Sequence, residues 1–207
     1  MRKSLIVYAF LLTAALSLTL FTTGGESTPV EKTKVSLFEP SIPKGPRKAG
    51  DCWTDSIAVL RPDAWRCMAG NEIYDPCFSR HDLKDAVVCG ANPASGNAGF
   101  VLNLTKPLPK GSAKTSEQPR PWLVKLADGS TCEIQTGTIP FVASLTVPYG
   151  CSDSRECGEK GCPWMTGLTD EFEGGPAWMA NKIIFSSSKN GFQLIKHVRL
   201  PVIAIWR

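Results

Sequence analysis

Short runs of alternating apolar and polar residues, separated by Gly, Pro, Asn and Asp, recur along most of the chain. This alternation is typical of β-strands that bury one face, and the separating residues favour turns. The clearest signal is the Asp128-Gly129 pair, which lies between residues 122–127 and 130–136 and predicts a β-hairpin. Further strands are expected at residues 84–89, 99–104, 144–149, 177–186 and 193–206, the last with a bend at Pro201.

Residues 61–70 depart from this pattern. Pro62 suits the first turn of a helix, Asp63 suits its positive end, and Gly70 suits the position after its last turn. The segment therefore predicts a short helix held by Cys67, and residues 74–77 predict a turn. Together the elements predict a mainly β fold, a small disulfide-stapled barrel or sandwich with one or two short helices.

The N-terminal residues 1–24 resemble a targeting segment. Arg2 and Lys3 precede an uncharged apolar run over residues 5–21, and small residues follow it. This order predicts either a signal peptide, cleaved near Gly24, or a retained N-terminal anchor. In both cases the rest of the protein is expected on the extracytoplasmic side, secreted or membrane-anchored. Residues 5–21, if uncleaved, would be its contact with a membrane.

Residues 25–50 are rich in Pro and Lys without apolar periodicity, and they predict a flexible stalk. Residues 51–207 are then expected to form the disulfide-stapled β-domain. The net charge of the whole chain is +4. All of this excess lies in the first 50 residues, so the β-domain is neutral. Because nucleic-acid binding needs clustered Lys and Arg, a nucleic-acid partner is not expected.

The chain contains 8 cysteines, an even number that predicts four disulfides in an exported protein. They form two groups in the sequence, residues 52–89 and 132–162, and pairing within each group leaves several patterns open. A nested pattern is preferred in the first group. The expected pairs are Cys52–Cys89, Cys67–Cys77, Cys132–Cys151 and Cys157–Cys162. No two cysteines have the Cys-x2-Cys spacing of a zinc site, and only 2 histidines are present, so neither a metal nor another cofactor is expected.

The sequence contains no nucleophile elbow, zinc-protease motif or phosphate-binding loop, and no catalytic residue is assigned. Two kinds of residue remain as candidates for function. Asp170, Glu171 and Glu173 could serve a carboxylate-dependent hydrolase, although an acidic turn is the simpler interpretation. Among the tryptophans, Trp164 and Trp178 are candidate ligand contacts.

Several motifs lie together in the β-domain. They are Cys52-Trp53-Thr54, Arg61-Pro62-Asp63-Ala64-Trp65-Arg66-Cys67-Met68 and Asp75-Pro76-Cys77, with Leu126-Ala127-Asp128-Gly129-Ser130-Thr131-Cys132 and Thr136-Gly137-Thr138 further on. The first three resemble the Cys-Trp-Thr, Arg-x-Asp-Ala-Trp-Arg-Cys-Met and Asp-Pro-Cys signature of a group of uncharacterised exported bacterial proteins, although Leu60 precedes the arginine where a Pro or a small residue is expected. The resemblance implies a location in the bacterial envelope or outside the cell, and it implies no activity.

These observations favour a non-enzymatic binding module at the cell envelope. Its partner would be an envelope component, a small ligand or another protein. Two alternatives stay open: a cell-envelope hydrolase that uses the carboxylates of residues 170–173, and a protease inhibitor that presents the loop between Cys151 and Cys162.

Overall fold

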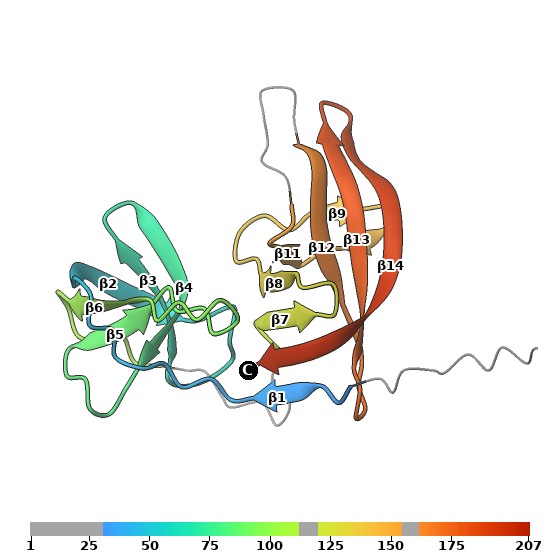
Figure 1. Cartoon of the computed structure of the whole chain (residues 1–207). Coiled ribbons are helices and arrows are strands. Elements are labelled where there is room, and N and C mark those ends of the chain that lie inside the picture. The colour runs from blue at the N-terminus through green and yellow to red at the C-terminus, as the bar shows by residue number, and fades with distance from the viewer. Residues whose placement is uncertain (1–30, 112–119, 155–161) are drawn as a thin grey trace, which may run out of the picture.

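The computed structural model describes residues 31–111, 120–154 and 162–207, and within these ranges it contains strands and no helix. The predicted mainly β, disulfide-stapled fold is confirmed. The described strands build two closed barrels that lie side by side (Figure 1). The sequence pattern predicts one barrel or sandwich over residues 51–207, whereas the structure has two barrels. The targeting segment over residues 1–24 lies outside the described residues.

Barrel 1 consists of consecutive strands that pair with their neighbours in sequence. The last strand, β6, returns to pair with β2 in parallel and closes the barrel. Its strands are β2 (Lys48–Asp55), β3 (Ala64–Ala69), β4 (Glu72–Ser79), β5 (Ala86–Cys89) and β6 (Phe100–Leu104).

Barrel 2 closes when its last strand, β14, pairs with its first, β7. Strand β1 (Lys34–Ser36) adds to β14 in parallel, and the small hairpin of β9 (Phe141–Val142) and β10 (Leu145–Thr146) packs on the wall formed by β12 and β13. The strands of barrel 2 are β7 (Leu123–Leu126), β8 (Thr131–Ile134), β11 (Tyr149–Cys151), β12 (Cys162–Glu173), β13 (Met179–Ser188) and β14 (Gly191–Trp206).

The predicted hairpin around Asp128-Gly129 is confirmed as β7 and β8. Gly129 has a φ of +87°, a backbone conformation that side chains with a Cβ rarely adopt. The Asp128 side chain accepts a hydrogen bond from the backbone N–H of Ser130 and thereby fixes the turn. Most of the other expected strands are also present, as β5, β6, β13 and β14.

The predicted helix over residues 61–70 is wrong. The region forms β3, in which Trp65, Cys67 and Ala69 point inward while Met68 points outward, the two-residue period of a strand. Gly70, expected to follow a helix, begins the turn between β3 and β4 with a φ of +60°. The turn predicted at residues 74–77 is wrong as well, because these residues belong to β4.

Strand register decides the cysteine pairing in barrel 1. Cys52 lies opposite Cys67 on β2 and β3, and Cys77 lies opposite Cys89 on β4 and β5. The structure therefore contains Cys52–Cys67 and Cys77–Cys89 in place of the nested Cys52–Cys89 and Cys67–Cys77.

The disulfide of barrel 2 forms as expected. Cys132 on β8 lies opposite Cys151 on β11, and the two are bonded. Cys157 lies outside the described residues, so the expected Cys157–Cys162 bridge stays a prediction. The three bridges indicate an oxidising environment.

The described part of the expected stalk is docked on the barrels. Strand β1 pairs with the end of β14, and the Phe38 ring packs edge-on against Phe78 of barrel 1 and Trp122 of barrel 2. Phe38 thus joins a buried cluster to which both barrels contribute, including Val59 from barrel 1. One continuous apolar core therefore holds the two barrels together. Among the described residues, no helix is long and apolar enough to cross a membrane.

Candidate functional site

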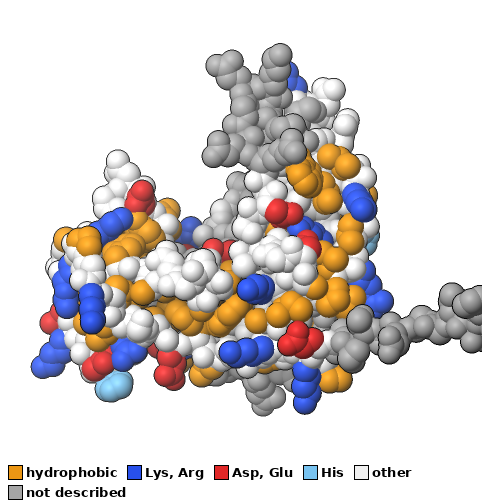
Figure 2. Space-filling view, in the orientation of Figure 1, with side chains coloured by type: hydrophobic (Ala, Val, Ile, Leu, Met, Phe, Trp, Pro, Cys, Tyr) orange, Lys and Arg blue, Asp and Glu red, His pale blue; other side chains and the backbone are white. Residues whose placement is uncertain are grey.

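The surface of barrel 1 contains a cavity of about 360 Å³, here called the Trp53 groove. Its floor is apolar and its border is charged. On the visible face of barrel 1, Figure 2 likewise shows hydrophobic side chains next to basic ones. The groove is lined by Gly50, Asp51, Trp53, Met68, Gly70 and Lys106.

Trp53 lies at a β-bulge on β2, and its side chain points outward. Cys52 pairs with Cys67 and Thr54 pairs with Arg66, so Trp53 is the extra residue on β2. Bulges of this kind interrupt the regular alternation of a strand, and Trp53 and Thr54 are both exposed. The Cys52–Cys67 bridge fixes the neighbouring pair of strand residues, and the indole is 44% exposed.

Met68 and two glycines complete the floor. Met68 is 42% exposed and points outward from β3, where it lies opposite Asp51 of β2. Gly50 is required at its position, because a Cβ there would lie 2.0 Å from the Met68 carbonyl oxygen. Gly70 has open space around it and leaves that end of the groove uncovered.

Charged groups border the groove on two sides. Lys106 Nζ lies 3.0 Å from Asp51 Oδ2, and the Thr105 hydroxyl donates to Asp51 Oδ1. The hydrogen bonds from Thr105 and Lys106 hold the pKa of Asp51 below its ordinary value, so this carboxylate is charged at neutral pH. On the other side the Arg66 guanidinium lies 5.8 Å from the Trp53 ring centre, within the range of a cation–π contact.

A second hydrogen-bond system fixes Arg66. It forms an ion pair at 3.2 Å with Asp75, whose side chain is fully buried, and it donates to the Thr136 carbonyl oxygen of barrel 2. The Ser56 hydroxyl and the Ile57 backbone N–H also donate to Asp75. Arg66 is therefore anchored at its far end, and its position beside the indole is preorganised.

Trp164 and Trp178, the predicted ligand contacts, lie on barrel 2, away from this groove. Trp178 is partly buried: its ring packs against Phe172, and the Arg207 guanidinium lies 5.3 Å from the ring centre. Trp164 is also partly buried. Neither lines a described cavity.

The predicted carboxylates lie on strand β12. Asp170, Glu171 and Glu173 are all exposed, and Glu173 pairs with Arg199 of β14. None of them lines a described cavity, and the turn expected here is a strand. The loop proposed for a protease inhibitor, between Cys151 and Cys162, falls largely outside the described residues.

A buried polar cluster in barrel 2 brings a serine and a lysine together. Lys182 Nζ lies 3.0 Å from Ser130 Oγ, 2.8 Å from Asp128 Oδ2 and 2.7 Å from Asp153 Oδ2. A Ser–Lys dyad needs a neutral lysine as its base. Here Lys182 Nζ forms ion pairs with the carboxylates of both Asp128 and Asp153, and we describe the cluster as a structural ion-pair network.

Three cysteine sulfurs in barrel 1 also lie close together. The Sγ atoms of Cys67, Cys77 and Cys89 are within 4.8 Å of one another. All three are bonded in disulfides and lack the thiolate form that binds metal.

In the sequence, Trp53 is one of 6 tryptophans, and it was not a predicted ligand contact. The alternation of apolar residues in β3 was the available signal for the outward position of Met68. No local residue pattern marks the bulge at Trp53, because the bulge depends on pairing with β3. Comparisons with models of known protein families, with curated proteins and with solved structures found no match.

Proposed function

We propose that the protein is an extracytoplasmic, non-enzymatic binding module and that its Trp53 groove binds a sugar of a cell-envelope polysaccharide. One observation carries the proposal: an exposed indole lines an open cavity whose border offers the paired carboxylate of Asp51 and ammonium group of Lys106.

A sugar ring suits this arrangement because it has an apolar face and polar hydroxyl groups, and the groove has an apolar floor and a charged border. The apolar C–H face of a pyranose can stack on the Trp53 indole beside Met68. Its hydroxyl groups can donate to Asp51 and accept from Lys106. The fixed bulge and disulfide reduce the ordering cost of binding.

The location is part of the same proposal. The disulfides are compatible with an extracytoplasmic domain, and the pattern of residues 1–24 supports export. The likeness of the Cys52–Cys77 motifs to a group of exported bacterial proteins supports it too. Membership of that group stays a prediction.

Titration calorimetry with a panel of soluble oligosaccharides tests the proposal. The panel would include β-1,4-linked N-acetylglucosamine oligomers as a probe of envelope polysaccharide, and the same sugars with a charged lactyl substituent. We expect one class to bind, with the Trp53→Ala variant about five- to tenfold weaker, since a lost stacking contact is worth about 1–1.5 kcal/mol.

Phe141→Ala provides the matched control, because Phe141 is an aromatic residue 64% exposed on barrel 2. This variant should bind as the unmodified protein does. Binding that survives Trp53→Ala but is lost in Trp178→Phe would move the site to barrel 2 and contradict the proposal. So would a complete absence of binding across the panel.

A further inference from the structure

Strand β14 of barrel 2 has a long stretch with an open edge. The strand is 16 residues long. Its last part, residues 202–206, lies between β7 and β1, whereas residues 192–199 pair with β13 alone among the described strands. Figure 1 shows this part of β14 as the outermost strand of barrel 2. Its outer backbone N–H and C=O groups are therefore available to another strand.

Both faces of this stretch are open to solvent. Residues 192–197 are all exposed, whereas a strand in a barrel wall normally buries alternate residues. Three of them are large apolar side chains: Phe192 is 40% exposed, Leu194 42% and Ile195 57%. The Phe192 ring packs edge-on against Phe185, which belongs to the buried cluster under the β9–β10 hairpin. The exposed apolar surface is thus continuous with the core.

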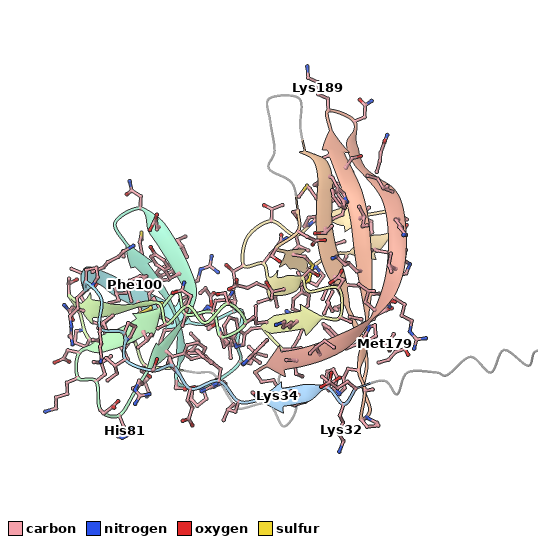
Figure 3. All side chains as sticks on the ribbon, viewed as in Figure 1. Lys32, Lys34, His81, Phe100, Met179 and Lys189 are labelled. Atoms are coloured by element: carbon pink, nitrogen blue, oxygen red, sulfur yellow. A yellow bond between two sulfur atoms is a disulfide. The ribbon has the colours of Figure 1, made fainter. Side chains whose placement is uncertain are left out.

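The stretch is positively charged. Residues 188–207 contain no Asp or Glu. Lys189 lies at the tip of the β13–β14 hairpin (Figure 3), and Lys196 follows the bulge at Ile195. No ion pair is found for either lysine among the described residues. Arg199 is already paired with Glu173. A second copy of this edge would bring like charges together, whereas an acidic segment would complement it.

A protein strand suits the edge better than a lipid surface does. Apolar side chains next to lysines also occur on membrane-binding surfaces. An unpaired strand edge, however, leaves its backbone groups without hydrogen bonds in lipid, at a cost of several kcal/mol for each group by the usual estimate. An added strand satisfies the same groups.

We propose that residues 192–199 of β14 form a docking edge for an extended, acidic segment of a partner protein. The segment adds to barrel 2 as a further strand. Its apolar side chains cover Phe192 and Leu194, and its carboxylates lie near Lys189 and Lys196. The bulge at Ile195 and the positive charge together restrict pairing with segments of other composition.

The probes are two capped octapeptides, one of alternating Glu and Val and one of alternating Lys and Val. Fluorescence anisotropy measures their affinity for the full protein, and hydrogen exchange measures protection of the β14 amides. We expect the acidic peptide to bind about tenfold or more tightly than the basic one, as expected when close charge pairs form. Bound acidic peptide should slow exchange at the amides of residues 192–199 that point away from β13.

Lys196→Glu should weaken binding of the acidic peptide about fivefold or more, a loss comparable to that of a close charge pair. Lys84→Glu, an exposed lysine on barrel 1, is the matched control and should leave binding unchanged. Three results would overturn the proposal: equal or absent binding of the two peptides, slow exchange in the free protein at the amides of residues 192–199 that point away from β13, or Lys196-dependent binding to phosphatidylglycerol vesicles without peptide binding.

Discussion

Arg61 Nη1 donates a hydrogen bond of 3.1 Å to the backbone carbonyl of Arg207, which follows the last strand of barrel 2. The same nitrogen donates at 2.8 Å to the Phe38 carbonyl. Arg61 is only 7% exposed, and its guanidinium also pairs with Asp63. One side chain of barrel 1 thus ties together the segment that precedes this barrel and the end of barrel 2.

Arg61→Met should lower the free energy of unfolding by about 2–4 kcal/mol. The substitution keeps the apolar stem but leaves the Phe38 carbonyl without this donor, at a cost of about 1–3 kcal/mol. It also removes one of the two hydrogen bonds to the Arg207 carbonyl, worth about 1 kcal/mol, while the bond from the Phe38 backbone N–H remains. Urea denaturation followed by tryptophan fluorescence measures the loss. Arg47→Ala, which alters an exposed arginine, should change stability by less than about 0.5 kcal/mol. Equal stability of the two variants would show that Arg61 does not join the barrels.

Replacement of both Cys132 and Cys151 by serine should cost about 3 kcal/mol. The bridge closes a segment with a sequence separation of 19 and restricts the unfolded chain accordingly. Urea denaturation of this variant beside the unmodified protein gives the difference.

A non-reducing peptide map of the unmodified protein checks the pairing itself. It should contain Cys52 joined to Cys67 and Cys77 joined to Cys89. Fragments that join Cys67 to Cys77 would show that the strand register of barrel 1 differs from the one described here.

Asp128 should account for part of the loss of stability in acid. Burial alone opposes ionisation of this carboxyl, but hydrogen bonds from Lys182 and Ser130 outweigh it and hold the pKa below its ordinary value. A carboxylate with a lowered folded-state pKa adds stability above the pKa of the unfolded chain, about 4, and that stability is lost as the pH falls through the folded-state pKa. Asp128→Asn should therefore be less stable at neutral pH and lose less on acidification.

Urea midpoints measured from neutral to acidic pH test this expectation. Asp85→Asn is the control, because Asp85 is exposed, has no ion pair among the described residues and has a φ of 49°, which asparagine tolerates. The control should follow the unmodified protein at every pH. An Asp128→Asn curve parallel to that of the control would contradict the linkage.

Tyr149 should stay protonated in the folded protein at alkaline pH. Burial raises the pKa of its hydroxyl far above the ordinary value, and the hydroxyl donates at 2.5 Å to the Pro121 carbonyl. A raised folded-state pKa contributes stability below the unfolded pKa of about 10, which is lost as the pH rises toward the folded-state pKa.

Tyr149→Phe should cost about 1 kcal/mol at neutral pH, the net worth of one hydrogen bond, and should make the alkaline decline of stability shallower. Phenolate absorbance during a pH titration gives an independent check. Ionisation of Tyr149 in the folded protein near the ordinary tyrosine pKa of about 10 would contradict the prediction.

Local chemistry made the β-hairpin at Asp128-Gly129 predictable, because the turn residues lie next to the strands they join. The helix prediction from Pro62 and Gly70 was wrong because it, too, rested on local residues alone. They fit the ends of a helix, but Trp65, Cys67 and Ala69 bury one face of a strand. The pairing of Cys52 with Cys67 depends on which strands are neighbours, and the residues around each cysteine do not encode this.

The candidate site depended even more on pairing between distant segments. Trp53 lies at a bulge that depends on pairing with β3, and the open edge of β14 follows from the shortness of β7. Asp170 and Glu171 resembled a turn because of their charge, although they belong to strand β12, at an irregularity between two residues that pair with β13. The chain composition limited the fold class, whereas register determined the functional surface.

The two barrels impose different orders of assembly on a growing chain. Barrel 1 uses residues 48–104 only, so it can close and form both of its bridges while residues 120–207 are still being made. Barrel 2 can close only when β14 has been made. Strand β1 is made first, but its partner β14 is made last. A pause in synthesis after residue 110 would therefore leave a finished first barrel with Phe78 and Val59 uncovered, an intermediate that chaperones could recognise.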